Sequence, residues 1–297
     1  MNAKIVNGHF LKIGICITFN PAFTHIFRIE DIHNDFKEIS KIGYKGVELS
    51  LRDVDDLNWQ EFDYEIKRNN MEFVTLATGL IRKLDGFSLM DKDVINRNSV
   101  VCKIKRMIGH ISEYPGSNKN ILIGYIKGEL SNDRVENKRR VSCLNESLWN
   151  LLNFAQKKKV VLVLEVINHK ETNFINNIAS GLELISNFKS DYLKLAVDTF
   201  HMNIDEKNGY NALKDAGSAI GYVHLSDNGR KFPGSGNINF KVILKALFEI
   251  NYKGYIMMEF NPQDDIQDKF QSLTKGYHYI KNLLCSFNKI NNCIINQ

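Results

Sequence analysis

Eight short runs rich in Val, Ile and Leu, separated by longer stretches whose apolar residues recur every three or four positions, constrain the fold of this chain most strongly. Such runs are typical of strands buried on both faces, and the intervening stretches have the period of amphipathic helices. This alternation predicts repeated βα units, and eight units favour one closed (β/α)8 TIM barrel. The expected strands are residues 12–18, 46–50, 72–78, 120–126, 160–167, 193–197, 220–226 and 254–260.

No low-complexity linker or change of composition divides the 297 residues. We therefore predict a single domain over residues 1–297, with the barrel at about 12–285. The last segment, 286–297, is rich in Asn and is expected to fray, as chain ends often do.

The composition argues against several classes of partner. Lys and Arg (39) exceed Asp and Glu (34) by five without forming a long basic tract, so no nucleic-acid partner is expected. Five scattered cysteines without a CxxC pair indicate neither a disulfide framework nor a thiolate zinc site, which favours a cytoplasmic location. No stretch approaches the roughly 18 apolar residues that cross a bilayer, and the N-terminus lacks a sustained signal-peptide core, so no membrane partner is expected.

Four of the predicted strands end on a side chain that can bind a metal ion. These residues are Glu165, Asp198, His224 and Glu259. A lone carboxylate in a buried strand costs several kcal/mol, by order of magnitude, unless a cation or a proton compensates it. Any one of the four could belong to an ordinary ion pair, but four successive cases at the carboxyl end of a barrel indicate an active site. Three carboxylates and one imidazole suit Mn²⁺ or Mg²⁺ better than a thiolate-preferring ion.

This set of residues predicts proton transfer beside a carbonyl group. A divalent ion with open coordination positions could bind the two neighbouring oxygens of a hydroxy-ketone and make the carbon between them acidic. Removal of that proton yields an enediolate, with a carboxylate as the general base. Glu165 and Glu259 could address opposite faces of one carbon, so that one takes a proton and the other returns it.

Three polar residues that follow these strand ends suit recognition of a polyol: Glu171, His201 and Arg230. Each can reach hydroxyl or carbonyl oxygens. Each also has an ordinary structural interpretation, since His201 could cap a helix, Glu171 could be a carboxylate at a helix N-terminus and Arg230 could be a solvated loop charge. The segment Pro233–Gly236 does not match a complete P-loop and is interpreted as a turn.

The segments LEVINHKETNFIN, VDTFHMNIDE, HLSDNGRKFPGSGNINF and MMEF, with ATGL, DGFSL and ILIGYIKG, carry a family resemblance. From about residue 12 to 285 the chain resembles the D-tagatose 3-epimerase branch of the xylose-isomerase-like barrels, and within it the bacterial keto-sugar and 5-keto-L-gluconate epimerases.

The resemblance implies a divalent-metal-dependent epimerase that acts on a small keto-sugar or keto-sugar acid through a cis-enediolate. It implies one ion, with Mn²⁺ first and Mg²⁺ or Co²⁺ as alternatives, bound by Glu165, Asp198, His224 and Glu259. Two of these ligands, Glu165 and Glu259, would form the acid/base pair, while Glu171, His201 and Arg230 would contact the substrate. A homodimer or homotetramer is implied as well.

The chain departs from the family pattern near the expected pocket. The usual Asn-Arg-aromatic-Glu is Asn168-His169-Lys170-Glu171 here, and the fourth strand is followed by Lys127-Gly128-Glu129, where relatives often have Arg-Gly-Arg. Gly229 stands where Asn is expected, and Lys231 stands where an aromatic residue often follows the substrate arginine. These changes affect the predicted substrate, because loss of an arginine and gain of Glu129 could weaken recognition of an acidic sugar, whereas Lys127 and Lys231 could restore it.

Several alternatives share the predicted site. An aldose-ketose isomerase, for example one acting on hydroxypyruvate, would use the same enediolate, and an inosose dehydratase would use similar ligands to expel a hydroxyl group. A non-catalytic sugar-binding barrel would tolerate the same pocket, although the pair of glutamates argues against it. A DNA-repair endonuclease on this fold would need several zinc ions, and the eight histidines show no multi-zinc pattern.

Overall fold

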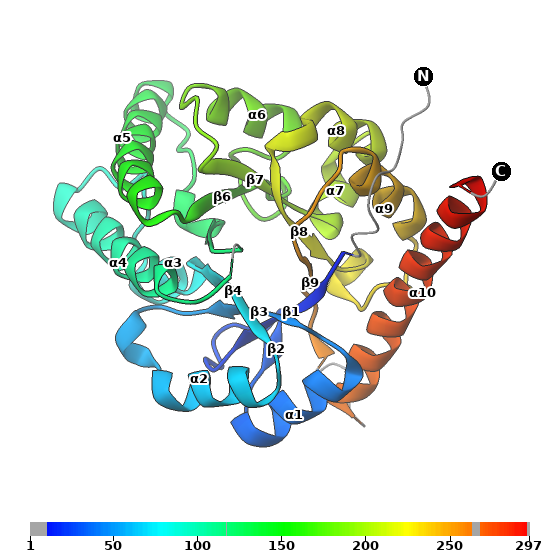
Figure 1. Ribbon diagram of the computed structural model, residues 1–297. Coiled ribbons are helices and arrows are strands. Elements are labelled where there is room, and N and C mark those ends of the chain that lie inside the picture. The colour runs from blue at the N-terminus through cyan, green and yellow to red at the C-terminus, as the bar shows by residue number, and fades with distance from the viewer. Residues whose placement is uncertain (1–10, 117, 263–267, 296–297) are drawn as a thin grey trace.

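The chain forms a closed parallel β-barrel surrounded by helices (Figure 1). The computed structural model describes residues 11–116, 118–262 and 268–295, with side chains as far as residue 287. Its strands are β1 (Ile13–Thr18), β2 (Phe27–Arg28), β3 (Gly46–Ser50), β4 (Glu72–Ala77), β5 (Asn120–Ile123), β6 (Val161–Glu165), β7 (Leu193–Asp198), β8 (Ile220–Leu225) and β9 (Ile256–Met258). Strand β1 pairs with both β3 and β9, which closes a ring of eight strands and confirms the predicted TIM barrel.

All eight predicted strands are present, with changes at their ends. The expected strand 120–126 stops at Ile123, because the backbone turns at Gly124 (ψ −112°) into a short 3-10 helix, η2 (Tyr125–Lys127). The expected strand 254–260 is reduced to β9, so Glu259 directly follows its last residue. One element was not predicted, the two-residue strand β2, which pairs with Ile17 and Thr18 of β1.

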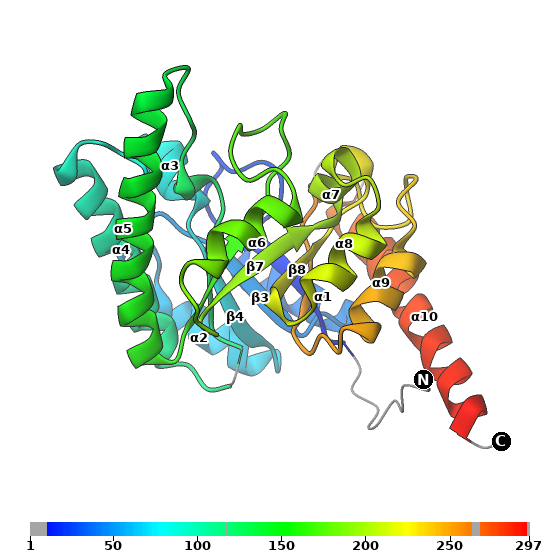
Figure 2. The same cartoon turned by 90° about the horizontal axis from the view of Figure 1, so that it is seen from above.

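The helices form the outer layer in both ribbon views (Figures 1 and 2). They are α1 (Ile32–Ile42), α2 (Trp59–Arg68), α3 (Gly79–Asp85), α4 (Val94–Ser112), α5 (Arg134–Lys158), α6 (Ile178–Ser186), α7 (Thr199–Asp205), α8 (Gly209–Ala216), α9 (Phe240–Glu249) and α10 (Lys269–Ile295). Asp or Asn side chains cap most of their N-termini, which satisfies free backbone N–H groups. Asp133, for example, accepts from the N–H groups of Val135 and Glu136 at the start of α5.

Helix α10 continues through Ile295, beyond the predicted end of the barrel at about residue 285. Residues 1–10 and 296–297 lie outside the described part of the chain. The single-domain boundary of 1–297 and the fraying of 286–297 therefore stay predictions.

The barrel interior positions the candidate site. Alternate strand residues point inward, since successive side chains of a strand face opposite sides. Inside lies a buried cluster that includes Val163, Ala196, Tyr222 and Met257. The residue two positions later on each of these four strand segments lies on the same face but nearer the carboxyl end of the barrel. These later residues are Glu165, Asp198, His224 and Glu259.

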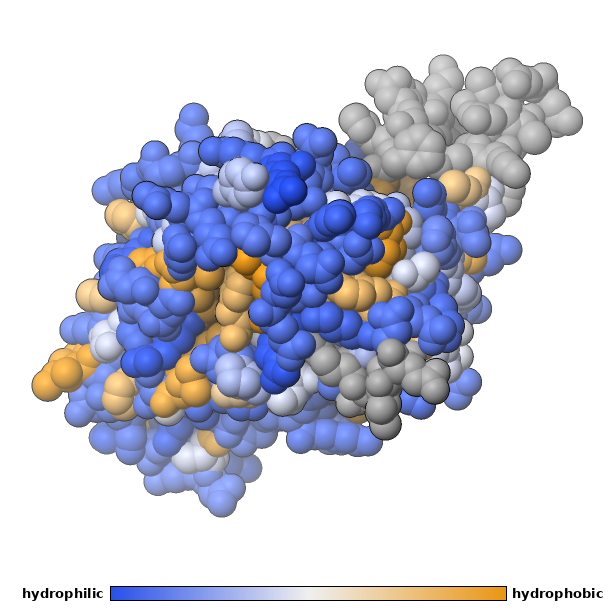
Figure 3. Space-filling view, turned by 90° about the horizontal axis from the view of Figure 1, so that it is seen from below, coloured by the Kyte–Doolittle hydropathy of each residue, from blue (hydrophilic) through white to orange (hydrophobic). Residues whose placement is uncertain are grey.

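The surface that carries α1 and α2 is largely hydrophilic, with apolar side chains visible in strips between the polar ones (Figure 3). Among the helices of the described residues, none combines the length and the apolar character needed to cross a membrane.

Candidate active site

A hollow lies at the carboxyl ends of the barrel strands. Ligand sites of TIM barrels commonly lie at this end. Apolar side chains and titratable groups both contribute to the wall of the hollow. The lining residues are Phe23, His25, Glu48, Ser50, Ala77, Gly79, Leu122, Gly124, Tyr125, Glu165, His201, Arg230 and Glu259.

Three of the four predicted metal ligands meet around one imidazole atom. His224 Nδ1 lies 3.2 Å from Glu259 Oε2 and 3.7 Å from Glu165 Oε1. One ligand atom from each of these residues lies within 4.8 Å of the others, and all three side chains are buried. Strands β6, β8 and the end of β9 thus bring together groups that are 35 to 94 residues apart in the sequence.

The fourth predicted ligand, Asp198, is next to this group but outside it. Asp198 pairs in register with His224 across β7 and β8. Its Oδ1 accepts hydrogen bonds from the Phe200 N–H (3.0 Å) and the Ser226 hydroxyl (3.1 Å). Its other oxygen, Oδ2, lies 3.6 Å from Arg230 Nη1. One carboxylate oxygen of Asp198 is therefore occupied by hydrogen bonds from neighbouring residues, while the other is directed toward the site.

The donor atoms fit a divalent cation. Asp198 Oδ2 and His224 Nδ1 are buried and make no hydrogen bond with any residue that the structure describes. A buried polar atom without a partner is costly, and a bound cation would satisfy both atoms. Together with Glu165 and Glu259 they form a set of mainly oxygen donors, the chemistry that hard divalent ions prefer.

The two glutamates differ in their electrostatic surroundings. Burial raises the pKa of Glu165 above its ordinary value, and the negative charge of Glu259 adds to that effect. Burial also opposes ionisation of Glu259, but the charges of His224 and Arg230 outweigh it and hold the Glu259 pKa below its ordinary value. Two neighbouring carboxyl groups with pKa values shifted in opposite directions can serve as an acid and a base.

Arg230 and Glu171, both predicted to bind substrate, form an ion pair at the edge of the hollow. Arg230 Nη2 lies 3.3 Å from Glu171 Oε2, and the guanidinium stacks 4.6 Å from the ring centre of Phe200. Glu171 also accepts hydrogen bonds from the Tyr125 hydroxyl (2.8 Å) and the Asn168 amide (3.2 Å). The structure thus holds these two side chains in defined positions.

His201, the third predicted substrate residue, is buried in α7. The Asn168 side-chain oxygen accepts from the Lys170 N–H, so its amide nitrogen faces His201 Nδ1 at 2.6 Å. An amide nitrogen can only donate. Arg230 Nη2, which can also only donate, faces the other ring nitrogen, Nε2, at 3.3 Å. Nε2 also lies 3.8 Å from carboxylate oxygens of both Glu165 and Asp198. Donor groups thus face both ring nitrogens of His201, which disfavours the doubly protonated imidazolium.

The loop after β8 holds Arg230 in an unusual conformation. Arg230 has a positive φ of 55°, as does the preceding Gly229 (φ 71°). The buried carboxylate of Asp227 accepts hydrogen bonds from the backbone N–H groups of Gly234 and Gly236. These contacts agree with the interpretation of Pro233–Gly236 as a turn, because its N–H groups are bound within the loop.

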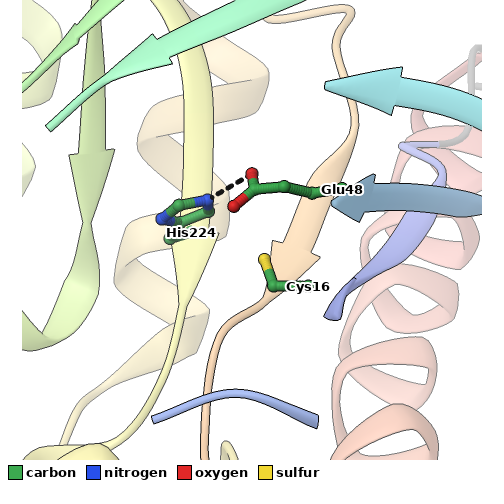
Figure 4. A group of neighbouring side chains, drawn as sticks. All are labelled: Cys16, Glu48 and His224. Atoms are coloured by element: carbon green, nitrogen blue, oxygen red, sulfur yellow. Dashed lines mark hydrogen bonds and ion pairs between the residues drawn. The ribbon is translucent and has the colours of Figure 1, made fainter. Parts of the chain in front are cut away.

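Sequence reasoning missed Glu48, which lines the hollow from β3. Glu48 lies beside His224, and Figure 4 shows the two side chains with Cys16. The signal was present, since Glu48 interrupts the fully buried strand β3 much as Glu165 interrupts β6. It was overlooked because it lies in the middle of the expected strand 46–50, away from the carboxyl end.

Lys127 lies deeper than the sequence suggested. Its ammonium group donates to the backbone carbonyls of Glu165 (3.2 Å) and Gly124 (3.4 Å). The side chain is fully buried, which lowers the pKa of Lys127 to about 8. Lys127 is not among the residues that line the hollow, so it supports the end of β6 instead of facing a sugar acid.

Curated relatives of this chain include carbohydrate epimerases. A D-psicose 3-epimerase from Enterocloster bolteae is 34% identical over a segment that spans 44% of this chain and 42% of the relative. A 3-dehydro-D-guloside 4-epimerase from Escherichia coli is 28% identical over 84% of this chain and 92% of the relative.

Solved structures share the fold at low sequence identity. The E. coli 3-keto-D-glucoside 4-epimerase, in its apo form, superposes with a TM-score of 0.76 over 92% of this chain and 99% of its own, at 24% identity. These findings agree with the predicted resemblance to the sugar-epimerase branch. The family model described as a xylose isomerase-like TIM barrel matches residues 36–276. The chain therefore belongs to the xylose isomerase-like TIM barrel family.

Proposed function

We propose that this protein is a divalent-metal-dependent epimerase that inverts a carbon next to the carbonyl group of a keto-sugar or keto-sugar acid. One observation carries the proposal: two buried glutamates with oppositely shifted pKa values, Glu165 and Glu259, approach the same imidazole nitrogen of His224 and line the hollow at the carboxyl ends of the strands. A binding protein would not need such an acid/base pair.

The names of the relatives support the same chemistry. A ketose 3-epimerase inverts the carbon beside a carbonyl at position 2, and a 3-dehydro-glycoside 4-epimerase inverts the carbon beside a carbonyl at position 3. The substrates differ, but in each case the inverted carbon carries a proton made acidic by the adjacent carbonyl. We therefore propose the reaction class with a keto-sugar as the small-molecule substrate.

The proposed ligands of the ion are Glu165, Asp198, His224 and Glu259. Mn²⁺ is the first candidate, with Mg²⁺ and Co²⁺ as alternatives, because the donors are mostly carboxylate oxygens. A divalent cation, when bound, supplies Lewis-acid stabilisation of the negative charge that develops on the carbonyl oxygen of the substrate.

Proton transfer is assigned to the two glutamates. Glu259, whose pKa is lowered, is the base that takes the proton from the carbon next to the carbonyl. Glu165, whose pKa is raised, is the acid that returns a proton to the opposite face of the resulting cis-enediolate. The roles exchange for the reverse reaction, as microscopic reversibility requires.

The remaining polar residues would orient the sugar. Arg230 can donate to the carbonyl and hydroxyl oxygens of the substrate, His201 can contact a hydroxyl group through Nε2, and Glu171 can accept from a hydroxyl group. Their mutual contacts limit how far each side chain can move. The predicted homodimer or homotetramer stays a prediction.

The test is hydrogen exchange in D₂O. The Mn²⁺-loaded protein is incubated with ketohexoses, pentuloses, keto-sugar acids, 3-keto-glycosides and hydroxypyruvate, and products are followed by NMR. We expect deuterium at an inverted carbon beside the carbonyl, lost on treatment with a chelator. A migrated carbonyl would instead support the isomerase alternative, and loss of water would support the dehydratase. Full activity of the chelated protein would refute metal dependence.

A further inference from the structure

Glu48 is a buried carboxylate for which the proposed reaction has no direct use. It lies on β3 with 1% of its surface exposed, and its side chain points across the barrel interior toward His224 of β8 (Figure 4). Glu48 Oε2 accepts a hydrogen bond from the Tyr222 hydroxyl (2.7 Å) and lies 2.9 Å from His224 Nε2. Cys16 from β1 completes the group.

The partners of Glu48 determine which nitrogen of His224 carries a proton. Among the described residues, Glu48 forms an ion pair with His224 and with no Lys or Arg. A carboxylate buried without such a cation depends on hydrogen-bond donors for its stability. An ionised carboxylate can only accept, so His224 Nε2 must carry a hydrogen and donate it to Glu48.

This assignment leaves Nδ1 as the ring nitrogen that can bind a cation. A metal ion on Nδ1 takes the place of a proton there, while the Nε2–H keeps its hydrogen bond to Glu48. Nδ1 is the atom that lies 3.2 Å from Glu259 and makes no hydrogen bond within the described residues. The contact on one side of the ring thus prepares the opposite side for a metal ion, as hydrogen bonds to metal-binding histidines commonly do.

We propose that Glu48 is a positioning residue that fixes the Nε2–H tautomer and the ring orientation of His224, so that Nδ1 is presented to the divalent cation. The inference rests on the metal site of the proposed function, but not on the identity of the sugar. Loss of such a contact typically weakens metal binding about 10- to 100-fold.

A second arrangement of the same atoms must be distinguished. Cys16, Glu48 and His224 Nε2 lie close enough to bind an ion of their own. Two features argue against a separate metal site at these three residues. The Glu48 oxygen nearest Nε2 already accepts from Tyr222, and burial raises the pKa of the Cys16 thiol, which disfavours the thiolate that a metal would need.

The first experiment determines the tautomer in the metal-free wild-type protein, with ¹⁵N-labelled histidine and long-range ¹H–¹⁵N correlation spectra. His224 is assigned by the signal that disappears in His224→Gln. We expect a protonated Nε2, whether or not Nδ1 also carries a proton in the absence of metal. A proton on Nδ1 with none on Nε2 would overturn the proposal. This measurement needs neither a folded Glu48 variant nor activity, so a failed epimerase assay does not affect it.

The second experiment measures the Kd of Co²⁺ and Mn²⁺ by competition with a chromophoric chelator. Glu48→Gln should raise the Kd about 10- to 100-fold. The matched control is Glu65→Gln on α2, since Glu65 is equally buried and also contacts a histidine, His33, but outside the site. The control should keep the wild-type Kd. The proposal would be overturned if the Kd of Glu48→Gln were within twofold of wild type, or if both variants lost the same metal affinity. It would also be overturned if the wild-type chain bound two ions and Glu48→Gln removed one of them.

Discussion

The guanidinium of Arg230 lies between two of the proposed metal ligands, with Nη1 3.2 Å from Glu259 Oε2 and 3.6 Å from Asp198 Oδ2. Arg230 thereby neutralises carboxylates that a divalent cation would also neutralise. The loop that carries it has positive φ at both Gly229 and Arg230, a conformation that costs free energy for the arginine. The arginine proposed to bind substrate and the proposed metal site are therefore coupled electrostatically.

This coupling predicts that Arg230→Ala behaves differently with and without metal. In the metal-free protein the variant should lose about 3 kcal/mol of unfolding free energy, because two buried carboxylates lose their nearest cation. Saturating Mn²⁺ should restore most of the loss, whereas sugar turnover should stay at least about 100-fold below wild type. Urea unfolding with and without Mn²⁺ measures the first effect. Arg106→Ala is the matched control, since Arg106 pairs with Asp53 and Asp55 on the surface.

Glu259→Gln should abolish proton exchange at the reacting carbon while retaining part of the metal binding. The amide keeps a coordinating oxygen but cannot accept the proton as a carboxylate does. We expect deuterium incorporation to fall about 10²- to 10⁴-fold. Exchange is followed by NMR, and the Mn²⁺ Kd is measured in parallel. Near-normal exchange in a metal-loaded variant would show that Glu259 is not the base.

Gly124→Ala should displace the Glu165 carboxylate without unfolding the barrel. A Cβ atom at residue 124 would overlap Glu165 Oε2, the far end of a flexible side chain, so that side chain has to move. We expect turnover to fall about 10- to 100-fold, because about 1 Å of misplacement at a catalytic group has effects of this order.

The control for this variant is Gly109→Ala. In α4, a Cβ at residue 109 meets no atom within 4 Å, and helix propensity predicts a gain of up to about 1 kcal/mol. Turnover of Gly109→Ala should equal wild type. If Gly124→Ala kept full turnover as well, the carboxylate position in the structure would not be the catalytic one.

The pH dependence of the free energy of unfolding should reveal the titration of His201. Burial, with the nearby charge of Arg230, lowers the pKa of His201 from 6.5 to about 3. Between these values the unfolded chain binds a proton that the folded chain does not. The contribution of neutral His201 to the free energy of unfolding is thus complete above pH 6.5. It is lost as the pH falls toward 3, by up to about 1.4 kcal/mol per pH unit.

His201→Gln removes this titration, so the unfolding free energy of the metal-free variant should fall less steeply between pH 6.5 and pH 4 than that of wild type. Urea unfolding at several pH values measures both slopes. Equal slopes would mean that His201 is protonated in the folded protein, which would contradict its assignment as a neutral imidazole.

Local patterns were sufficient for the eight barrel strands. The run before Glu165 is continuously apolar, and such a run indicates a buried strand wherever the rest of the chain lies. The same reasoning reached Asp198, His224 and Glu259, because each stands at or near the end of such a run. Strand ends were less certain, since a backbone turn like that at Gly124 depends on contacts with the neighbouring strands.

The amino-acid sequence by itself determined the repeated βα units and the side chains that lie at the carboxyl ends of the strands, because hydrophobic period and strand alternation are local properties. Only the tertiary structure decided which atoms meet. Closure of the barrel brings Glu48 to His224 across 176 residues, and it directs the ammonium of Lys127 to backbone carbonyls instead of a substrate. These pairings depend on distances between strands and on the exclusion of water, which no local pattern of residues encodes.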